Sequence, residues 1–341
     1  MEHLVPRLRT TEYLTTRDRI EAELDNVRSA LEWSLPTNGS DDVGDVTLGV
    51  RLCQAMIWFW YTGGYAEEGR RWLERATERL QGDGPDEIAV LHGLAVILLQ
   101  QGEAASAQQL LSRCLDYWRA RDNDQEIAKE LNSLAIAYRN SGVPDQARHL
   151  LQEGIARAQR SDDTRRLATL FCNLGLLETD VGSPVAAIDL LGRAITLDRE
   201  LGDSWAEACD RVNLAAARIR AGQLDQAERE LREVSHDALA VDDIDLTIGL
   251  IEVLAMLRGE SADARRSARL FGTAETMREQ AKLPRPAPDA ALLNRSLARS
   301  RATVSEGTWS SYVGEGRRLS REDAVAEGIW DAGGTPGPSS G

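Results

Sequence analysis

Three asparagines recur at a near-constant spacing and are the side chains best suited to binding chemistry. Asn132, Asn173 and Asn213 are 41 and 40 residues apart; the last two directly precede a leucine, and the first lies one step earlier in its repeat. A side-chain amide offers donors and an acceptor, so a row of amides can hold the backbone of an extended peptide. The alternative is a structural ladder in which the asparagines bond to each other and to neighbouring helices. The sequence leaves both interpretations open.

Other side chains map to the same predicted groove. Arg139, Asp180 and Arg220 fall near its end and would add charge selectivity. His92 maps to its inner side and would touch a ligand there, although an isolated histidine is more often a solvated or structural residue. These residues extend the predicted contact surface for a partner or ligand.

An aromatic cluster, residues 56–61, contains the remaining candidates. Trp58 and Tyr61 share a helix face through their three-residue spacing and map to the inner side. They would form a platform for a ligand or peptide. The alternative, which we favour, is that they pack against the N-terminal helix and seal the end of the fold.

The signatures of catalysis are missing from the sequence. A P-loop requires a glycine-rich turn ending in Gly-Lys-Ser/Thr, and this chain has no Gly-Lys dipeptide. No HExxH, GxSxG or metal-type Cys/His pattern occurs. We therefore predict that the chain is not an enzyme and that it needs no cofactor or metal.

The elements that must position these residues are helices in a repeat. Turn glycines recur at intervals of 38, 40, 40 and 40 residues, and each is followed five residues later by a small residue and nine later by a leucine. The glycines are Gly64, Gly102, Gly142, Gly182 and Gly222. Aspartates recur in a matching frame, where they would cap helix N-termini: Asp124, Asp163, Asp203 and Asp243.

In the copy at residues 170–203, two apolar runs of helical period flank Gly182 and Pro184. Neither helix can bury its apolar stripe alone, so each pair needs a neighbouring pair. The fold class predicted is therefore all-α, a right-handed α-solenoid of about six helix pairs with helical caps.

The domain boundaries follow from this frame. We predict an N-terminal capping helix and linker over 1–42, a solenoid over 43–281, a C-terminal helical cap over 282–332 and a disordered tail over 333–341. The capping helix would run from Thr15 to Ser34, opened by a Thr15–Asp18 capping pattern. Pro284, Pro286 and Pro288 would impose an extended crossing before cap helices at 289–304 and 321–330.

The repeat resembles a known family. The Leu174-Gly175 pair, the turn Gly182 and the spaced small residues are similar to the tetratricopeptide pattern in its longer form. The flanking stretches EAELDNVRSALEW, GYAEEGRRWLERA and ARLFGTAETMRE resemble the helical C-terminal region of LuxR-type and antibiotic-regulatory-type signalling ATPase regulators of actinobacterial type. The resemblance covers roughly residues 15–330 and lacks those regulators' ATPase and DNA-binding domains.

Charge and composition narrow the choice of partner. The formal net charge is −15, so a nucleic-acid backbone would be repelled and direct nucleic-acid binding is not expected. No apolar run is long enough for a membrane span and no signal peptide is recognisable, which predicts a cytoplasmic protein without membrane contact. The four isolated cysteines, Cys53, Cys114, Cys172 and Cys209, suit a reduced interior.

These observations favour an interaction or sensor module of a bacterial transcriptional or signalling regulator. It would bind a peptide, protein or small inducer in the groove, and its partner would include an ATPase or DNA-binding regulator domain. Two other hypotheses stay open: a free-standing scaffold without an effector, and, with less support, an enzyme on a helical solenoid.

Overall fold

The computed structural model describes residues 13–329 except 37–44, 63, 81, 83 and 242. The predicted disordered tail and most of the predicted linker lie outside this range. Where it is described, the chain is helical, with seventeen helices and no strand. The prediction of an all-α solenoid is confirmed.

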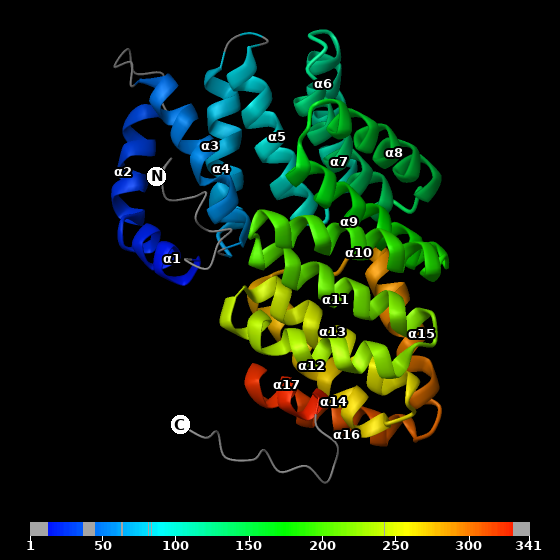
Figure 1. Cartoon of the computed structure of the whole chain (residues 1–341). Coiled ribbons are helices and arrows are strands. Elements are labelled where there is room, and N and C mark those ends of the chain that lie inside the picture. Colours follow the sequence, from blue (N-terminus) through cyan, green and yellow to red (C-terminus); the bar gives the residue numbers. More distant parts are fainter. Residues whose placement is uncertain are drawn as a thin grey trace.

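Six helix pairs form the body of the molecule and stack in chain order (Figure 1). They are α3(Val46–Thr62) with α4(Ala66–Arg79), α5(Pro85–Gln100) with α6(Ala104–Arg119), α7(Asp124–Asn140) with α8(Pro144–Arg160), α9(Thr164–Val181) with α10(Pro184–Leu201), α11(Ser204–Arg220) with α12(Leu224–Val241), and α13(Ile244–Glu260) with α14(Ala264–Ala281). The first helices of successive pairs contact one another and form an inner layer.

The repeated glycines make the turn inside the first five pairs, whereas Ala262, with a φ of 58°, stands in the turn of the sixth. Gly64, Gly102, Gly142, Gly182 and Gly222 all have a positive φ, between 73° and 90°. An L-residue with a side chain rarely adopts this left-handed conformation, which explains why glycine recurs there. The period of the sequence is therefore the period of the turns.

Side-chain caps begin most of the inner helices. Asp163, Asp203 and Asp243 each accept a hydrogen bond from the backbone N–H three residues later. The prediction for Asp124 is wrong, because Asn123 caps α7 and Asp124 instead pairs with Arg157 and Arg160. A neutral amide cap leaves the carboxylate free to link α7 to α8.

The N-terminal end differs from the prediction of one helix. It contains two, α1(Tyr13–Ala22) and α2(Leu24–Ser34), separated at Glu23. Thr15 lies inside α1, so the predicted Thr15–Asp18 cap is wrong. The break allows Ile20, Leu24 and Leu31 all to be buried against the first repeat.

The C-terminal end contains three helices, α15(Ala287–Arg301), α16(Glu306–Gly316) and α17(Arg321–Ile329). The extended crossing is shorter than predicted because Pro288 sits in the first turn of α15, where a missing N–H costs nothing. The sequence analysis did not predict α16 as a helix, although this helix buries Trp309.

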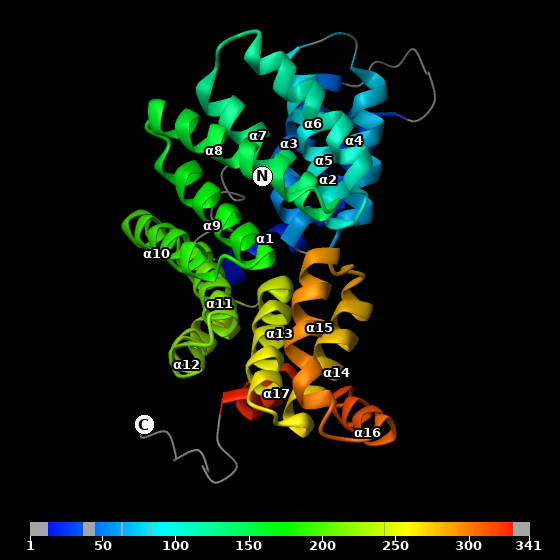
Figure 2. The same cartoon turned by 90° about the vertical axis from the view of Figure 1, so that its right-hand side faces the viewer.

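The stack curls so that distant segments meet. Trp58 of α3 lies edge-on to Trp205 of α11, with ring centroids 5.3 Å apart. On another side, α15 lies beside α13 and reaches α7 and α9 (Figure 2). The inner surfaces of early and late repeats therefore face one another.

Candidate functional site

Polar contacts join three successive steps of the inner layer, from α5 through α7 and α9 to α11. The first links α5 to α7: His92 Nδ1 lies 2.8 Å from Glu130 Oε2. The Glu130 side chain is fully buried, and its other oxygen lies 3.8 Å from Lys129 Nζ. His92 is therefore paired with a carboxylate and is not an isolated histidine.

The second contact joins two of the predicted asparagines. Asn173 Nδ2 of α9 donates a hydrogen bond of 2.8 Å to Asn132 Oδ1 of α7. Within the described residues, Asn132 Nδ2 and Asn173 Oδ1 bond no other group. One donor and one acceptor thus remain on a pair that is already held in place by its own hydrogen bond.

The third contact links α9 to α11. Asn213 Nδ2 lies 3.6 Å from Cys172 Sγ, and the same thiol bonds to the carboxyl group of Asp210. Asp210 is buried and shares a hydrogen bond with Asp198 of α10. Burial and the neighbouring Asp198 raise the pKa of Asp210 well above its usual range, and burial raises the pKa of the Cys172 thiol.

The asparagine ladder is therefore present between Asn132 and Asn173, whereas Asn213 bonds to the sulfur of Cys172, the residue before Asn173. Ligand contact by these asparagines stays a prediction. The ladder does not exclude it, because each amide group uses only part of its hydrogen-bonding capacity in the ladder.

A guanidinium group lies close to the asparagine ladder. Arg166 of α9 has no ion pair within the described residues, and its Nε is buried without a hydrogen-bond partner. Burial lowers the pKa of Arg166 although Asp163, Glu126 and Glu130 act in the opposite direction. Sequence reasoning missed this cation.

The predicted aromatic candidates occupy the place where the curled stack meets itself. Trp58 stacks on Tyr61 with centroids 5.5 Å apart and also contacts Trp205. The Trp205 indole in turn lies close to Asp243, the cap of α13. Trp58 thus joins the first repeat to the fifth, a role beyond the expected seal at the end of the fold.

Arg139 of α7 and Asp180 of α9 meet each other and α15 at one end of the inner layer. Arg139 bonds Asp180 at 2.6 Å and Asp289 of α15 at 2.5 Å. Burial opposes the charge of Arg139, but the two carboxylates outweigh it and raise its pKa. The charge of Arg139 is therefore balanced by carboxylates of the same chain. Arg220 lies beside Gly182 and close to Asp180.

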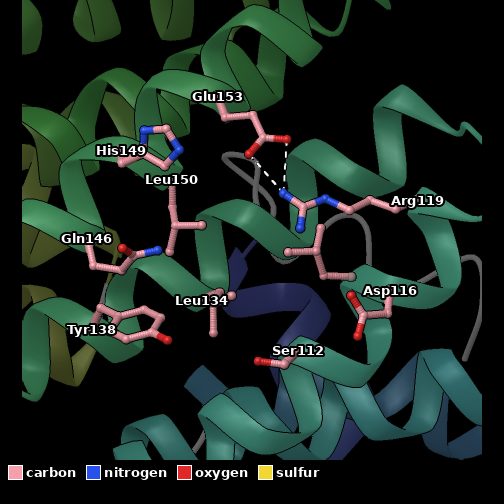
Figure 3. Close-up of a pocket in the computed structure, with 10 residues that line it drawn as sticks. Ser112, Asp116, Arg119, Leu134, Tyr138, Gln146, His149, Leu150 and Glu153 are labelled. Atoms are coloured by element: carbon pink, nitrogen blue, oxygen red, sulfur yellow. Dashed lines mark hydrogen bonds and ion pairs between the residues drawn. The ribbon is translucent and has the colours of Figure 1, made fainter.

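One cavity lies away from this surface, between α6, α7 and α8 (Figure 3). Its volume is about 310 Å³. Buried Leu115, Leu134 and Leu150 form its floor, and the Arg119–Glu153 ion pair of 2.9 Å crosses it. None of the predicted contact residues lines it.

Glu130 and Asp210 are the inner-layer carboxylates that the sequence analysis missed. A signal existed: they are 80 residues apart, or two repeat periods, with Leu170 at the equivalent position between them. An acidic residue at a frame position that is otherwise apolar marks a buried polar contact.

Within the described residues no group of three or more His, Cys, Asp or Glu side chains could hold a metal ion. No helix in that part of the chain is long and apolar enough to cross a membrane.

Tetratricopeptide-repeat family models match residues 131–161, 88–113 and 211–233. These segments are tetratricopeptide repeats within an all-α repeat solenoid. No curated protein matches it. Among solved structures, a Rap protein complexed with competence and sporulation factor has a TM-score of 0.67 at 14% identity, covering 94% of this chain and 82% of that one.

Two further structures share the solenoid. Aspartyl phosphate phosphatase F from Bacillus subtilis has a TM-score of 0.60 at 12% identity and covers 94% of this chain and 93% of its own. The apo form of the quorum sensor NprR from B. thuringiensis has a TM-score of 0.55 at 14% identity, with coverages of 90% and 85%. At these identities the likeness concerns the fold.

Proposed function

We propose that this chain is a sensor or interaction module of a bacterial transcriptional or signalling regulator and binds an extended peptide segment along its inner layer. Its working unit is the solenoid over 43–281, with caps over 1–42 and 282–332. The resemblance of its flanks to LuxR-type regulators supports an ATPase or DNA-binding domain as the effector. The fold of peptide-complexed Rap proteins also supports the proposal.

The observation that carries this proposal is the Asn132–Asn173 pair. Its free donor and free acceptor match the C=O and N–H groups of one peptide backbone. Because the two amides already hold each other, binding would cost little side-chain ordering. Asn213 offers its side-chain oxygen one repeat further, and Arg166 offers a desolvated positive charge nearby.

Peptide display against the purified protein tests the proposal. Enriched peptides are synthesised with a fluorophore, and their affinities are measured by anisotropy for wild type, for the Asn173→Ala/Asn213→Ala double variant and for Asn294→Ala. Asn294 is exposed on α15 and is the matched control. We expect the double variant alone to lose affinity ten- to hundredfold, about the effect of two lost hydrogen bonds.

A second measurement separates backbone from side-chain recognition. N-methylation of the central peptide bond removes the donor of the ligand and should weaken binding, whereas exchange of the adjacent side chain should not. The proposal fails if no peptide is enriched, or if the folded double variant binds as tightly as wild type.

A further inference from the structure

Another cavity lies outside the asparagine ladder, where the tips of two helix pairs meet α15. Its volume is about 230 Å³, smaller than the several hundred Å³ of sites that enclose drug-sized ligands. Its apolar lining comes from the α7–α8 turn, the end of α9 and α15: Pro144, Leu177, Val181, Pro288 and Leu292. The space suits one aliphatic side chain.

Exposed valines lie in or next to the α7–α8 and α9–α10 turns at this cavity. Val143 is 44% exposed, Val181 is 42% exposed and Val185 is 76% exposed. They are three of the five large apolar side chains that are exposed in the described part of the chain. Val143 lies between Gly142 and Pro144, which both line the cavity, and Val181 lines it directly. An apolar surface concentrated at the tips of neighbouring pairs is typical of an interaction site.

The charges at the cavity are positive on balance, in a chain whose formal net charge is −15. Arg139 is matched by Asp180 and Asp289. Arg295 lines the cavity and has no ion pair within the described residues. Arg220, beside Gly182, has a buried Nε without a hydrogen-bond partner. Three guanidinium groups thus face two carboxylates, which leaves one positive charge in excess.

We propose that this cavity and its valine rim dock a segment of a partner protein that carries an aliphatic side chain next to a carboxylate side chain. The aliphatic group fills the space between Leu177 and Leu292, and the carboxylate pairs with Arg295 and Arg220. A basic segment would meet the positive excess and be repelled. This site is separate from the asparagine ladder and does not depend on it.

Methyl NMR of protein labelled at leucine and valine tests the site. The probe is the capped pentapeptide acetyl-Gly-Leu-Glu-Leu-Gly-amide, compared with its Glu→Gln analogue and with a free-acid form, acetyl-Gly-Leu-Gln-Leu. The Glu peptide should shift the methyl signals of Leu177, Val181 and Leu292 in a saturable way. The Gln analogue should bind about two- to fivefold more weakly, the effect of one exposed ion pair.

Variants give the decisive comparison. Arg295→Gln should reduce the affinity for the Glu peptide towards that of the Gln analogue, with Arg220 retaining part of the difference. Arg299→Gln removes the same charge one turn further along α15, outside the cavity lining, and should change nothing. Asn173→Ala/Asn213→Ala should also bind the Glu peptide normally, which separates this site from the proposed peptide track.

Several results would overturn the proposal. Equal binding of the Glu and Gln peptides, or an equal effect of Arg295→Gln and Arg299→Gln, would remove the charge argument. Tighter binding of the free-acid peptide than of the Glu peptide would assign the site to a chain end. Shifts of the same methyl signals on raising protein concentration alone would assign it to a second copy of the chain.

Discussion

Trp58 and Trp205 are separated by more than a hundred residues along the chain, yet their rings meet edge-on at a centroid distance of 5.3 Å. This contact joins α3 to α11 across the inner layer. It is one of the few side-chain contacts that hold the first repeats against the later ones, because each pair otherwise contacts mainly its neighbours. The curvature of the solenoid therefore depends on a long-range contact as well as on the packing of neighbouring pairs.

Trp205→Ala should open the curl. Loss of an aromatic pair costs about 0.5–1.5 kcal/mol beyond the buried area, which is small against the stability of the repeats but large for a single distant contact. The radius of gyration from small-angle X-ray scattering should increase while circular dichroism is unchanged. Trp33→Ala, which truncates a tryptophan that is 61% exposed on α2, is the control and should leave the radius unchanged.

The Asn132–Asn173 hydrogen bond should contribute to stability as well as to binding. Asn132→Ala should lower the free energy of unfolding by about 1–3 kcal/mol, because Asn132 is 4% exposed and its removal leaves the Asn173 amide without its acceptor. A double-mutant cycle by urea denaturation should give a coupling of about 1 kcal/mol. Additive effects would contradict the observed hydrogen bond.

Arg139→Ala should release α15 from the repeats. The substitution removes the cation that bridges Asp180 and Asp289, and the Asp180 side chain is only 12% exposed. We expect the free energy of unfolding to fall by about 3 kcal/mol. This is the lower end of the range for breaking a buried ion pair, since Asp289 is partly exposed. Amide hydrogen exchange should accelerate in α15. Arg299→Ala, on the exposed side of α15, should not have this effect.

The buried Asp210 carboxyl group predicts a pH dependence. Its pKa in the folded chain is raised above the ordinary value of 3.8, so the folded state binds a proton that the unfolded state releases. Stability from this group is therefore present at low pH and is lost as the pH rises above about 4 and through the raised pKa. Burial is the main cause, and Cys172, Asp198 and Asp203 are the neighbouring titratable groups.

Asp210→Asn should remove this dependence, because an amide keeps a donor for Asp198 without acquiring a charge. The melting temperature of wild type should fall more between pH 5 and pH 8 than that of the variant, and the variant should be the more stable at pH 8. Parallel pH profiles for the two proteins would show that Asp210 does not titrate as described.

Two helical glycines should respond to alanine in opposite directions. A Cβ at Gly175 would lie 2.7 Å from Leu191 Cγ, so Gly175→Ala should destabilise the chain by about 1–3 kcal/mol through overpacking. No atom lies within 4 Å of a Cβ at Gly192, so Gly192→Ala should stabilise α10 by about 0.5–1 kcal/mol. Thermal unfolding of both variants measures the difference.

The candidate site was only partly predictable. The repeat frame led to Asn132, Asn173 and Arg139, because equivalent positions of successive helices lie side by side in a solenoid. It missed Arg166, whose Nε is buried and has no hydrogen-bond partner within the described residues. It also missed Glu130, which is buried and pairs with His92 on the adjacent inner helix. Burial and pairing depend on which residues of two neighbouring helices meet, whereas a periodic pattern describes each sequence position separately.

The sequence by itself determined the helix pairs, their number and their turns, since these depend on interactions within about 40 residues: apolar periodicity, glycine at positive φ and capping side chains. Only the tertiary structure decided how the stack curls. The meeting of Trp58 with Trp205, and of Arg139 with Asp289, depends on small rotations added over several repeats. No local pattern encodes such a sum, so the contacts that close the molecule appear only when the whole chain is assembled.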